Sequence, residues 1–419
     1  MNSLKPMLLT SLKSYNRSQF IKDVTAGIIV AIIALPLSIA LALASGVGPE
    51  AGIFTAIVAG FVISALGGSS VQIAGPTAAF ATIVAGIVAK DGMDGLVIAT
   101  ILAGIFLVLM GLCHFGSLIK FIPFTITTGF TSGIAVTIVI GQLKDFFGLT
   151  YPDGVKPIET TEKFRAVVEN FSTINIDALI VGAVSLAVLI IAPYIFKRIP
   201  GSLIAVIVGI LMVQFLPLKV STIGNLYTIS NSLPSFHLPA VSLEVVQNAL
   251  PNAFTIAVLA AIESLLSCVV ADGMINGKHR SDMELVAQGA GNIASALFGG
   301  IPATGAIART AANIKNGGRT PVAGMVHSIT LVIVLVVLMP YAGMIPMPTI
   351  AAILFVVAYN MCQWRTFVKL VKTAPKSDVI VLFTSFILTV LFDLVVAIEI
   401  GMVLACLLFI KRMSEETHV

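Results

Sequence analysis

Charged residues are scarce in this sequence. Of its 419 residues only 11% are charged, whereas 58% are hydrophobic. A soluble domain carries about 25% charged residues, so this composition excludes an ordinary soluble protein. A bilayer core of about 30 Å needs about 20 apolar residues per helix, and such segments follow one another along almost the whole chain. The sequence therefore predicts an all-α polytopic membrane protein whose main surroundings are the lipid bilayer.

Cysteine is scarce as well, and so are the motifs of enzymes. The four cysteines, Cys113, Cys268, Cys362 and Cys406, show no CxxC spacing, which argues against a disulfide framework and against a metal site. The modest net charge of +4 is spread over short loops, so nucleic acid is not an expected partner. The sequence has no nucleophile motif and no phosphate-binding loop. We therefore expect no enzyme, and no cofactor beyond a co-transported proton or sodium ion.

Fourteen segments are predicted to enter the membrane. With the N-terminus inside, seventeen of the 24 Lys and Arg residues lie on the inner side and six on the outer side, as the positive-inside rule requires. We expect a protein of the bacterial inner membrane with both termini in the cytoplasm. The predicted ranges are 24–45, 50–66, 70–89, 93–113, 117–143, 175–196, 200–216, 245–271, 282–298, 301–314, 320–340, 345–362, 377–393 and 395–411.

The first 22 residues lack the apolar core and the cleavage site of a secretory signal. We expect residues 1–22 to be a cytoplasmic segment and residues 413–419 to be a cytoplasmic tail. The stretch from Leu8 to Phe20 is either an interfacial amphipathic helix or a plain lead-in to the first membrane segment.

The two halves of the sequence are similar at an offset of about 230 residues. Gly67-Gly68 opens one segment as Gly299-Gly300 opens another, and a Gly/Pro pattern after Gly116 returns after Gly343. Gly and Pro are common in membrane helices, so either match alone has little weight, but two matches at one offset favour duplication. Seven segments per half would give the halves opposite orientations, a 7+7 inverted repeat typical of secondary transporters.

The third and tenth segments each hold a Gly/Pro-rich stretch before a short helical run. The stretch from Ser70 to Ala74 is predicted to be extended, and Pro76 suits the first turn of a helix. Non-helical backbone at membrane depth is tolerated only where it is buried in protein or lines a cavity. Two half-helices would direct free N–H groups and about half a positive charge each at a common point, which predicts an anion site.

Arg309 and Glu263 lie inside predicted segments, where a charge costs roughly 2.5–3.5 kcal/mol. We interpret Arg309 as a counter-charge for the substrate, the alternatives being a structural ion pair or a snorkel toward the cytoplasm. Glu263 is interpreted as the residue that couples transport to a proton or sodium, the alternative being a fixed salt bridge to Arg309. Ser267, one turn further on, is a candidate to complete a cation or substrate site.

The charge of this predicted site bears on the substrate. Two helix ends and Arg309 bring about +2 in total. A dianion such as sulfate would therefore travel with a protonated Glu263, whereas a monoanion such as bicarbonate would tolerate an ionised Glu263 with sodium nearby.

Several stretches, together covering nearly the whole chain, resemble the SulP family of sulfate and inorganic anion transporters. They are Asp23-Val-Thr-Ala-Gly27 with Ala34-Leu-Pro36, Val71-Gln-Ile-Ala-Gly-Pro-Thr77, Val270-Ala-Asp-Gly273, Gly299-Gly-Ile-Pro-Ala-Thr-Gly-Ala-Ile-Ala-Arg-Thr310, Asn316-Gly-Gly-Arg-Thr320 and Asp393-Leu-Val-Val-Ala-Ile-Glu-Ile-Gly401.

The resemblance implies two domains that slide against each other in an elevator-like mechanism. Segments 1–4 and 8–11, at 23–114 and 245–342, would form a mobile core domain. Segments 5–7 and 12–14, at 115–244 and 343–412, would form a gate domain, which often mediates homodimers. The implied anion site comprises Ala74, Gly75, Pro76, Thr77 and Ala78, facing Thr304, Gly305, Ala306, Ile307 and Ala308, with Arg309 adjacent, and Glu263 matches the family's acidic residue.

The sequence departs from the family in two respects. Many members have Pro-Gln and a nearby Tyr in the first segment, where this chain has Pro36-Leu37 and Leu41, so we expect apolar contacts from that helix. Most members also continue into a cytoplasmic STAS domain, which is absent from this sequence, since it stops at Val419. The leading function is proton-coupled sulfate transport, the alternatives being sodium-coupled bicarbonate or C4-dicarboxylate uptake and, in a different class, a passive anion channel.

Overall fold

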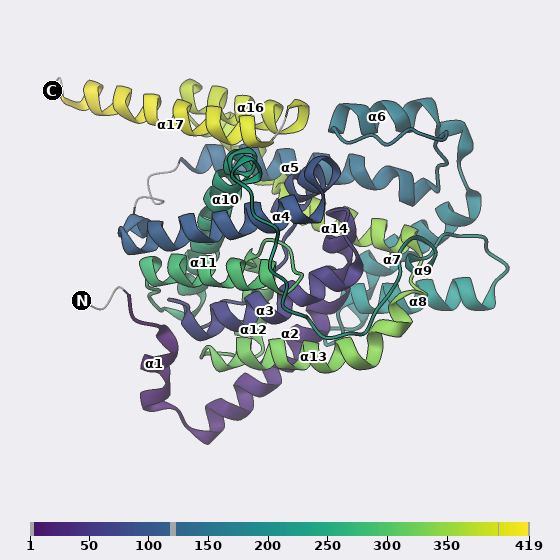
Figure 1. Cartoon of the computed structure of the whole chain (residues 1–419), viewed down its shortest axis with the longest axis horizontal. Helices are drawn as coiled ribbons and strands as arrows, with labels where there is room; N and C mark the ends of the chain where they lie inside the picture. The colour runs from purple at the N-terminus through teal and green to yellow at the C-terminus, as the bar shows by residue number, and fades with distance from the viewer. Residues whose placement is uncertain (1–3, 118–122, 393, 418–419) are drawn as a thin grey trace.

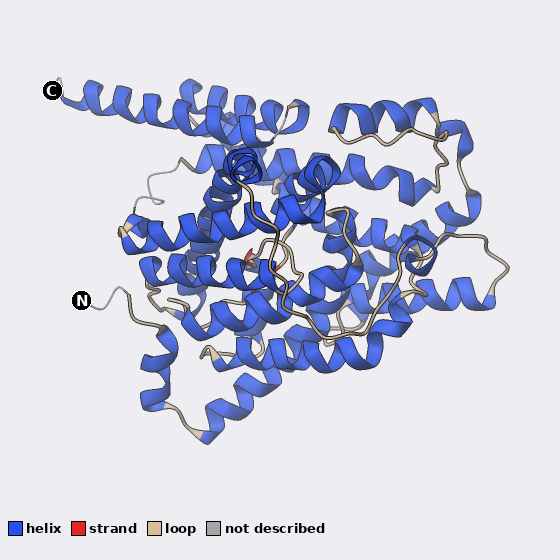
Figure 2. Ribbon diagram, viewed as in Figure 1, coloured by secondary structure: helices blue, strands red, loops and turns tan. Residues whose placement is uncertain are grey.

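The computed structural model describes residues 4–117, 123–392 and 394–417, and in these ranges it is almost entirely helical (Figures 1 and 2). Lys120 and Asp393, which the sequence analysis uses, lie outside the described residues. The elements are α1 (Met7–Ser11), α2 (Arg17–Ala44), α3 (Pro49–Leu66), β1 (Ala74–Gly75), η2 (Ala78–Phe80), α4 (Ala81–Leu112), α5 (Phe124–Phe147), α6 (Thr160–Glu169), α7 (Ile176–Ile195), α8 (Gly201–Phe215), α9 (Ile223–Leu226), α10 (Leu243–Ile275), α11 (Ser281–Leu297), β2 (Thr304–Gly305), α12 (Ile307–Lys315), α13 (Val322–Ala342), α14 (Met347–Cys362), α15 (Trp364–Thr373), α16 (Lys376–Leu391) and α17 (Leu394–Thr417).

Each range predicted to enter the membrane contains helix in this structure. Among the described residues, eight helices are long and apolar enough to cross a bilayer, and α8 is a shorter apolar helix. The predicted third and fourth segments form the single element α4, which breaks at Gly92 with φ 70° and ψ −171°. Glycine tolerates this positive φ because it has no Cβ, so the break lies where the sequence predicts a turn.

The helices fall into two packed groups. In the first, here called the core group, α3 packs on α11 and α13, α4 packs on α10 and α11, and α2 packs on α13. In the second, the gate group, α5 packs on α14 and α16, and α7 packs on α8 and α14. The contacts come in equivalent pairs: α2 lies on α13 as α10 lies on α4, and α3 lies on α13 as α11 lies on α4.

Two short strands join the halves of the core group at its centre. β1 pairs with β2 in antiparallel fashion, with Ala74 opposite Gly305 and Gly75 opposite Thr304. The paired residues are 231 and 229 positions apart (305 minus 74 and 304 minus 75), which brackets the offset of about 230 between the sequence matches. The backbone therefore brings equivalent positions of the two halves together.

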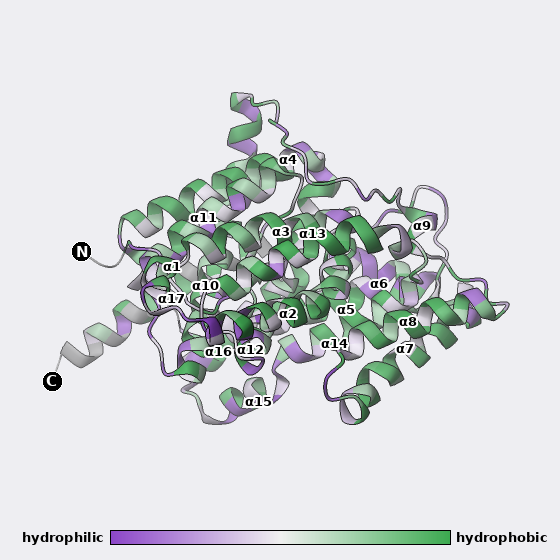
Figure 3. Ribbon diagram, turned by 90° about the horizontal axis from the view of Figure 1, so that it is seen from below, coloured by the Kyte–Doolittle hydropathy of each residue, from purple (hydrophilic) through white to green (hydrophobic). Residues whose placement is uncertain are grey.

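Both chain ends lie at one end of the molecule, here called the terminal end, in two perpendicular views (Figures 1 and 3). α6 and α9, which belong to the two long predicted loops, lie at the opposite end, here called the loop end. Large apolar side chains such as Ile190, Tyr194 and Ile333 are exposed on the outer faces of the helices. Such a surface suits a helix bundle whose outside faces lipid.

The N-terminal segment differs from one sequence-based expectation. A single helix from Leu8 to Phe20 is wrong, because α1 ends at Ser11 and α2 begins only at Arg17. Asn16 is extended between them, with φ −133° and ψ 165°, and its side chain accepts a hydrogen bond from the Gln19 amide at 2.9 Å. An asparagine in this position caps a new helix, so it ends the preceding one.

The start of α2 is tied to the loop before α13 by Asp23, which is fully buried. Its carboxylate accepts hydrogen bonds from the Tyr15 hydroxyl and the Gln19 amide group, both at 2.9 Å. It also accepts from the Arg319 backbone N–H at 2.9 Å and from the Thr320 hydroxyl at 2.5 Å. Two motifs almost 300 residues apart, at Asp23 and at Thr320, therefore form one junction at the terminal end.

Candidate anion-binding site

Side chains of α12 hold the extended backbone before β1. The Ile73 N–H donates to the Thr310 hydroxyl at 3.0 Å, and the Asn313 side-chain amide donates to the Val71 carbonyl at 2.9 Å. All four residues are buried. Backbone groups without partners are costly at membrane depth, so these bonds make non-helical chain tolerable there.

The stretch around β2 is held in the same way by α10 and α11. The Gly305 N–H donates to the Ser264 hydroxyl at 3.1 Å. Asn292 binds both backbone groups of Ala303, accepting from its N–H at 2.8 Å and donating to its carbonyl at 2.9 Å. The position of each extended stretch is therefore fixed by the other half of the core group or by a neighbouring helix.

Glu284 is a buried carboxylate that the sequence analysis did not single out. It lies on α11 and accepts hydrogen bonds from the Gly68 N–H at 2.9 Å, the Gln72 side-chain amide at 2.7 Å and the Gln288 side-chain amide at 2.8 Å. The sequence signal was a carboxylate within a predicted membrane segment. Its partners were not visible, because Gly68 and Gln72 are more than 200 residues away.

Two helix N-termini meet near the strand pair. The 3-10 turn η2 begins directly after Thr77, and α12 begins directly after Ala306. Neither Thr77 nor Ala306 makes a side-chain capping hydrogen bond. The first N–H groups of a helix have no acceptor within the helix, so both ends offer donors and partial positive charge to an anion.

A cavity of about 520 Å³ lies between the core group and the gate group at these helix ends. Its core side includes Leu37, Leu41, Pro76, Thr77, Ala78, Glu263, Ala306, Ile307, Ala308 and Arg309, and its gate side includes Phe124, Thr127, Thr128, Thr131, Pro193, Gly201, Asn360, Met361 and Gln363. Alternation of the helices from the N-terminus places Phe124, Pro193, Gly201 and Gln363 toward the terminal end. The cavity therefore extends from the helix ends toward that side of the molecule.

Arg309 is the cation of this cavity. Its side chain is only 1% exposed. One guanidinium nitrogen, Nη2, donates to the Pro76 carbonyl at 3.2 Å and to the Ser38 hydroxyl at 3.4 Å. Nε and Nη1 have no hydrogen-bond partner among the described residues. A buried charge without partners is costly, so these two donors are suited to binding an anion.

Gly75 and Arg309 are in close contact. A Cβ added at Gly75 would lie 2.2 Å from Nη1 of Arg309, far inside van der Waals contact. The absence of a side chain at this residue is therefore what lets the guanidinium lie against the strand pair. This close approach explains the glycine in physical terms, since its φ is not positive.

Glu263 also lines the cavity and is partly buried. The structure gives no salt bridge between Glu263 and Arg309, and within the described residues Arg309 makes no ion pair. The alternatives of a fixed pair or a structural ion pair are therefore wrong for this conformation. A snorkel is wrong as well, because the Arg309 guanidinium is buried between Pro76 and Ser38.

The structure separates the predicted site residues into two sets. Seven of the predicted substrate residues and Glu263 line the cavity, whereas Ala74, Gly75, Thr304 and Gly305 form the strand pair behind it. Ser267 does not line the cavity, and its hydroxyl donates to the Thr310 hydroxyl at 3.5 Å. Its contact is therefore with the framework of the half-helices.

The gate side contributes hydroxyl groups that sequence reasoning missed. Thr127, Thr128 and Thr131 face the cavity from α5, with Asn360 and Gln363 from the end of α14. The signal was the spacing of three and four residues between the threonines, which places them on one helix face. On the first helix, Leu37 and Leu41 are apolar lining as expected, but the neighbouring Ser38 contacts Arg309.

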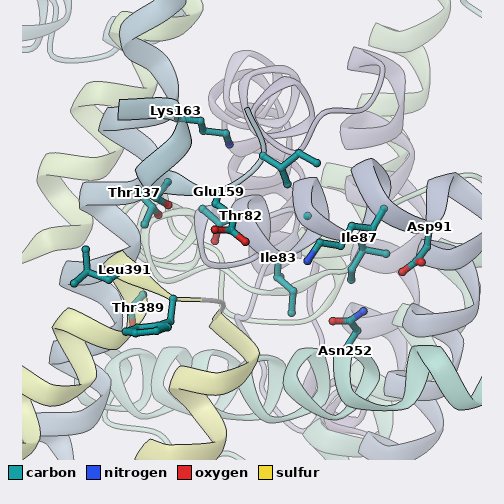
Figure 4. A pocket seen from close by; sticks show the side chains of 15 residues that line it. Thr82, Ile83, Ile87, Asp91, Thr137, Glu159, Lys163, Asn252, Thr389 and Leu391 are labelled. Atoms are coloured by element: carbon teal, nitrogen blue, oxygen red, sulfur yellow. The ribbon is translucent and has the colours of Figure 1, made fainter. Parts of the chain in front are cut away.

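A second cavity, of about 170 Å³, lies at the loop end of the boundary between the two groups (Figure 4). Thr82 of α4 lines it from the core group, and Thr137 of α5 and Thr389 of α16 line it from the gate group. Lys163 of α6 also lines it, and burial lowers the pKa of this ammonium group. Polar groups of both signs therefore follow this boundary at the loop end as well.

An arginine buried beside two helix N-termini, within a bundle built to face lipid, is the arrangement of an anion-transporting membrane protein. A family model described as the sulfate permease family matches residues 20–385. The chain belongs to this family.

The relatives and neighbours of the chain carry two kinds of name. The chain is 43% identical over 413 residues to a putative sulfate transporter, YvdB of Bacillus subtilis (strain 168), covering 97% of this chain and 77% of that one. It is 33% identical over 403 residues to the bicarbonate transporter BicA of Picosynechococcus sp., covering 94% of this chain and 70% of that one. The solved transmembrane domain of a cyanobacterium bicarbonate transporter BicA matches with a TM-score of 0.82 and 28% identity, covering 92% of this chain and 98% of that one.

Proposed function

We propose that the protein is a secondary active transporter that moves sulfate together with a proton. The observation that carries this proposal is the buried Arg309 guanidinium, whose Nε and Nη1 have no partner among the described residues. With the ends of η2 and α12 it brings about +2 to one side of the cavity. This charge matches a dianion if Glu263, on the same cavity, is protonated. Family membership and the 43% identity to a putative sulfate transporter support this substrate.

Movement of the core group against the gate group would carry the anion across the membrane. Both cavities lie between these two groups, and the anion-site residues other than the gate hydroxyls belong to the core group. The paired packing of helices and the strand offsets of 229 and 231 support a 7+7 inverted repeat with fourteen membrane segments. The common position of the termini supports a cytoplasmic location for both of them in a bacterial inner membrane, with homodimer formation through the gate group.

Sodium-coupled bicarbonate uptake is the second candidate. It is favoured by 33% identity to a bicarbonate transporter and by the apolar Leu37 and Leu41 on the cavity. A monoanion would need less positive charge, so Glu263 would stay ionised. C4-dicarboxylate uptake differs in the size of its anion, and a passive anion channel would not accumulate any anion against its gradient.

Uptake into proteoliposomes tests these candidates. Purified protein would be given radiolabelled sulfate with and without an inward proton gradient, and then labelled bicarbonate or succinate with and without a sodium gradient. We expect proton-driven accumulation of sulfate above its equilibrium level. Sodium-driven uptake of bicarbonate with no transport of sulfate would replace the first candidate by the second. Equilibration without accumulation of any anion would indicate a channel.

The role of Glu263 is tested by its isosteric amide. We expect Glu263→Gln to abolish the pH dependence of sulfate uptake and to retain sulfate–sulfate exchange, because glutamine cannot release or bind the coupled proton. Ser267→Ala is the matched control on the same helix, since Ser267 does not line the cavity. Initial uptake rates between about pH 5 and 8 measure the effect, and an unchanged pH profile in Glu263→Gln would reject the coupling role.

A further inference from the structure

The short helix α15 differs from the other helices in its position and its surface. It connects α14 to α16 and lies at the periphery of the molecule (Figure 3). Its side chains divide into faces because residues three or four apart share one side of a helix. Phe367 and Leu370 are partly buried and form its inner face, and Phe367 makes ring contacts with Phe383 and Phe386 of α16 at centroid distances of 5.6 Å.

A second face of α15 is apolar and exposed. Trp364, Val368 and Val371 are 47%, 40% and 36% exposed, and their spacing of four and three residues aligns them along the helix. The Trp364 indole N–H donates to the hydroxyl of Tyr359, which is itself 62% exposed, at 3.2 Å. Tryptophan and tyrosine with one polar end and one apolar body are typical of the boundary between membrane and water.

A third face is basic. Arg365, Lys369 and Lys372 are exposed and have the same spacing of four and three residues, one position after the apolar series. At 100° per residue the basic face therefore borders the apolar face and lies roughly opposite the packed face. The sequence of α15 contains no Asp or Glu, and the exposed Lys376 follows at the start of α16.

We propose that α15 lies in the headgroup region of the membrane and binds anionic phospholipids through Arg365, Lys369 and Lys372. Trp364, Val368 and Val371 would enter the boundary with the acyl chains, and the basic face would be at the level of the phosphates. An acidic surface on a protein partner would match the basic face but not the exposed apolar face beside it. The combination of both faces favours lipid.

The proposal does not depend on the transported anion. It concerns the outside of the gate group, whereas the candidate anion site lies on the inside of the boundary with the core group. Gln363 joins the two places, since it lines the cavity and directly precedes α15, with a left-handed backbone of φ 44°. A lipid-bound α15 would therefore hold the end of α14 at a defined depth.

The chain contains a built-in probe for this interaction. Trp364 is the single tryptophan of the sequence, so the tryptophan fluorescence of the whole protein reports on α15 alone. The full chain would be reconstituted in phosphatidylcholine vesicles that contain either brominated phosphatidylglycerol or brominated phosphatidylcholine at the same mole fraction. Bromine on the acyl chain quenches tryptophan only at short range, so the ratio of the two quenching efficiencies measures local enrichment of the anionic lipid.

We expect brominated phosphatidylglycerol to quench Trp364 more strongly, by at least about twofold at low mole fraction, since each basic residue near the surface raises association roughly fivefold. The preference should fall to about one in the triple variant Arg365→Gln, Lys369→Gln and Lys372→Gln, and it should weaken at high salt.

The matched control is Lys197→Gln, Arg198→Gln and Lys278→Gln, which removes the same charge from exposed residues in other loops. This control should keep the preference for phosphatidylglycerol. The proposal is rejected if both lipids quench Trp364 equally, if the two triple variants lose the preference to the same degree, or if neither lipid quenches. The last result would place α15 in water or against another protein.

Discussion

At the scale of single residues, the cavity is governed by one arginine whose charge the protein leaves incompletely neutralised. Arg309 contacts Pro76 and Ser38 through one nitrogen, and its two other donors have no partner among the described residues. Sequence reasoning identified Arg309 and Glu263, because a charge within an apolar segment is visible in one dimension. It misplaced Ser267 and missed Glu284, because their surroundings depend on residues from other helices.

Removal of the guanidinium should weaken anion binding. We expect Arg309→Ala to raise the Kd for sulfate by about 10- to 100-fold, since hydrogen bonds to charged groups contribute about 1.5–3 kcal/mol each. Arg309→Lys should lose less, because it keeps the charge but not the planar donor pair. Isothermal titration of detergent-solubilised protein would measure both variants. A wild-type Kd in Arg309→Ala would show that the anion binds elsewhere.

A methyl group at Gly75 should act on the same guanidinium from behind. The new Cβ would lie 2.2 Å from Nη1, so Arg309 has to move away from the strand pair. We expect Gly75→Ala to raise the Kd for sulfate by about tenfold or more. Gly141→Ala is the matched control, because no atom lies within 4 Å of a Cβ built there. Equal affinities in both variants would contradict this account of Gly75.

At the scale of elements, the sequence predicted the number and place of the helices better than their connections. Hydropathy located α2 through α17 because burial in lipid requires long apolar runs. The break in α4 at Gly92 was predicted as a turn, but the antiparallel pairing of Ala74 with Gly305 was not, since register depends on partners from both halves. The proposed helix from Leu8 to Phe20 failed at Asn16, whose capping side chain starts α2 instead.

The junction at Asp23 gives a pH-dependent element outside the membrane segments. Burial, followed by the hydrogen bond to Asp23, raises the pKa of the Tyr15 hydroxyl to about 12. Because this pKa is raised above the ordinary value of about 10, the contact is fully present below pH 10 and is lost as the pH rises through about 12. The N-terminal segment should therefore stay docked under all neutral conditions.

Absorbance at 295 nm, taken as the difference between the wild-type protein and Tyr15→Phe in detergent, isolates the titration of this hydroxyl. We expect a midpoint near 12. Asp23→Asn should lower that midpoint, because the neighbouring negative charge is removed. A midpoint near 10 in the wild-type protein would mean that the contact between Tyr15 and Asp23 does not persist in solution.

At the scale of the whole molecule, two groups of helices meet along a boundary that holds both cavities. The larger cavity extends toward the terminal end, and the smaller one lies at the loop end beside α6. The sequence resemblance predicted the division into core and gate, whereas the cavity hydroxyls of Thr127, Thr128 and Thr131 required the packed structure. A proposed sliding motion would have to change the distance across this boundary.

A cross-link across the smaller cavity should therefore stop transport. Thr82→Cys on α4 and Leu391→Cys on α16, in a variant without the four native cysteines, would be joined by a reducible bifunctional reagent. We expect sulfate uptake to be lost on cross-linking and restored by reduction. Thr137→Cys and Thr389→Cys, which join α5 to α16 within the gate group, form the control pair and should remain active. Full uptake by the first pair when cross-linked would contradict sliding.

The strand pair also constrains how the polypeptide is made. During synthesis the first half of the chain leaves the ribosome before the second half exists. Until Thr310 and Asn313 emerge, the backbone of Val71 and Ile73 lacks the side chains that later satisfy it, and β1 lacks β2. The third segment must therefore wait for the tenth before it is completed, in water or beside the insertion machinery, because lipid cannot supply the missing hydrogen bonds. The centre of the binding site is thus among the last parts of the protein to mature, although half of it is among the first to be translated.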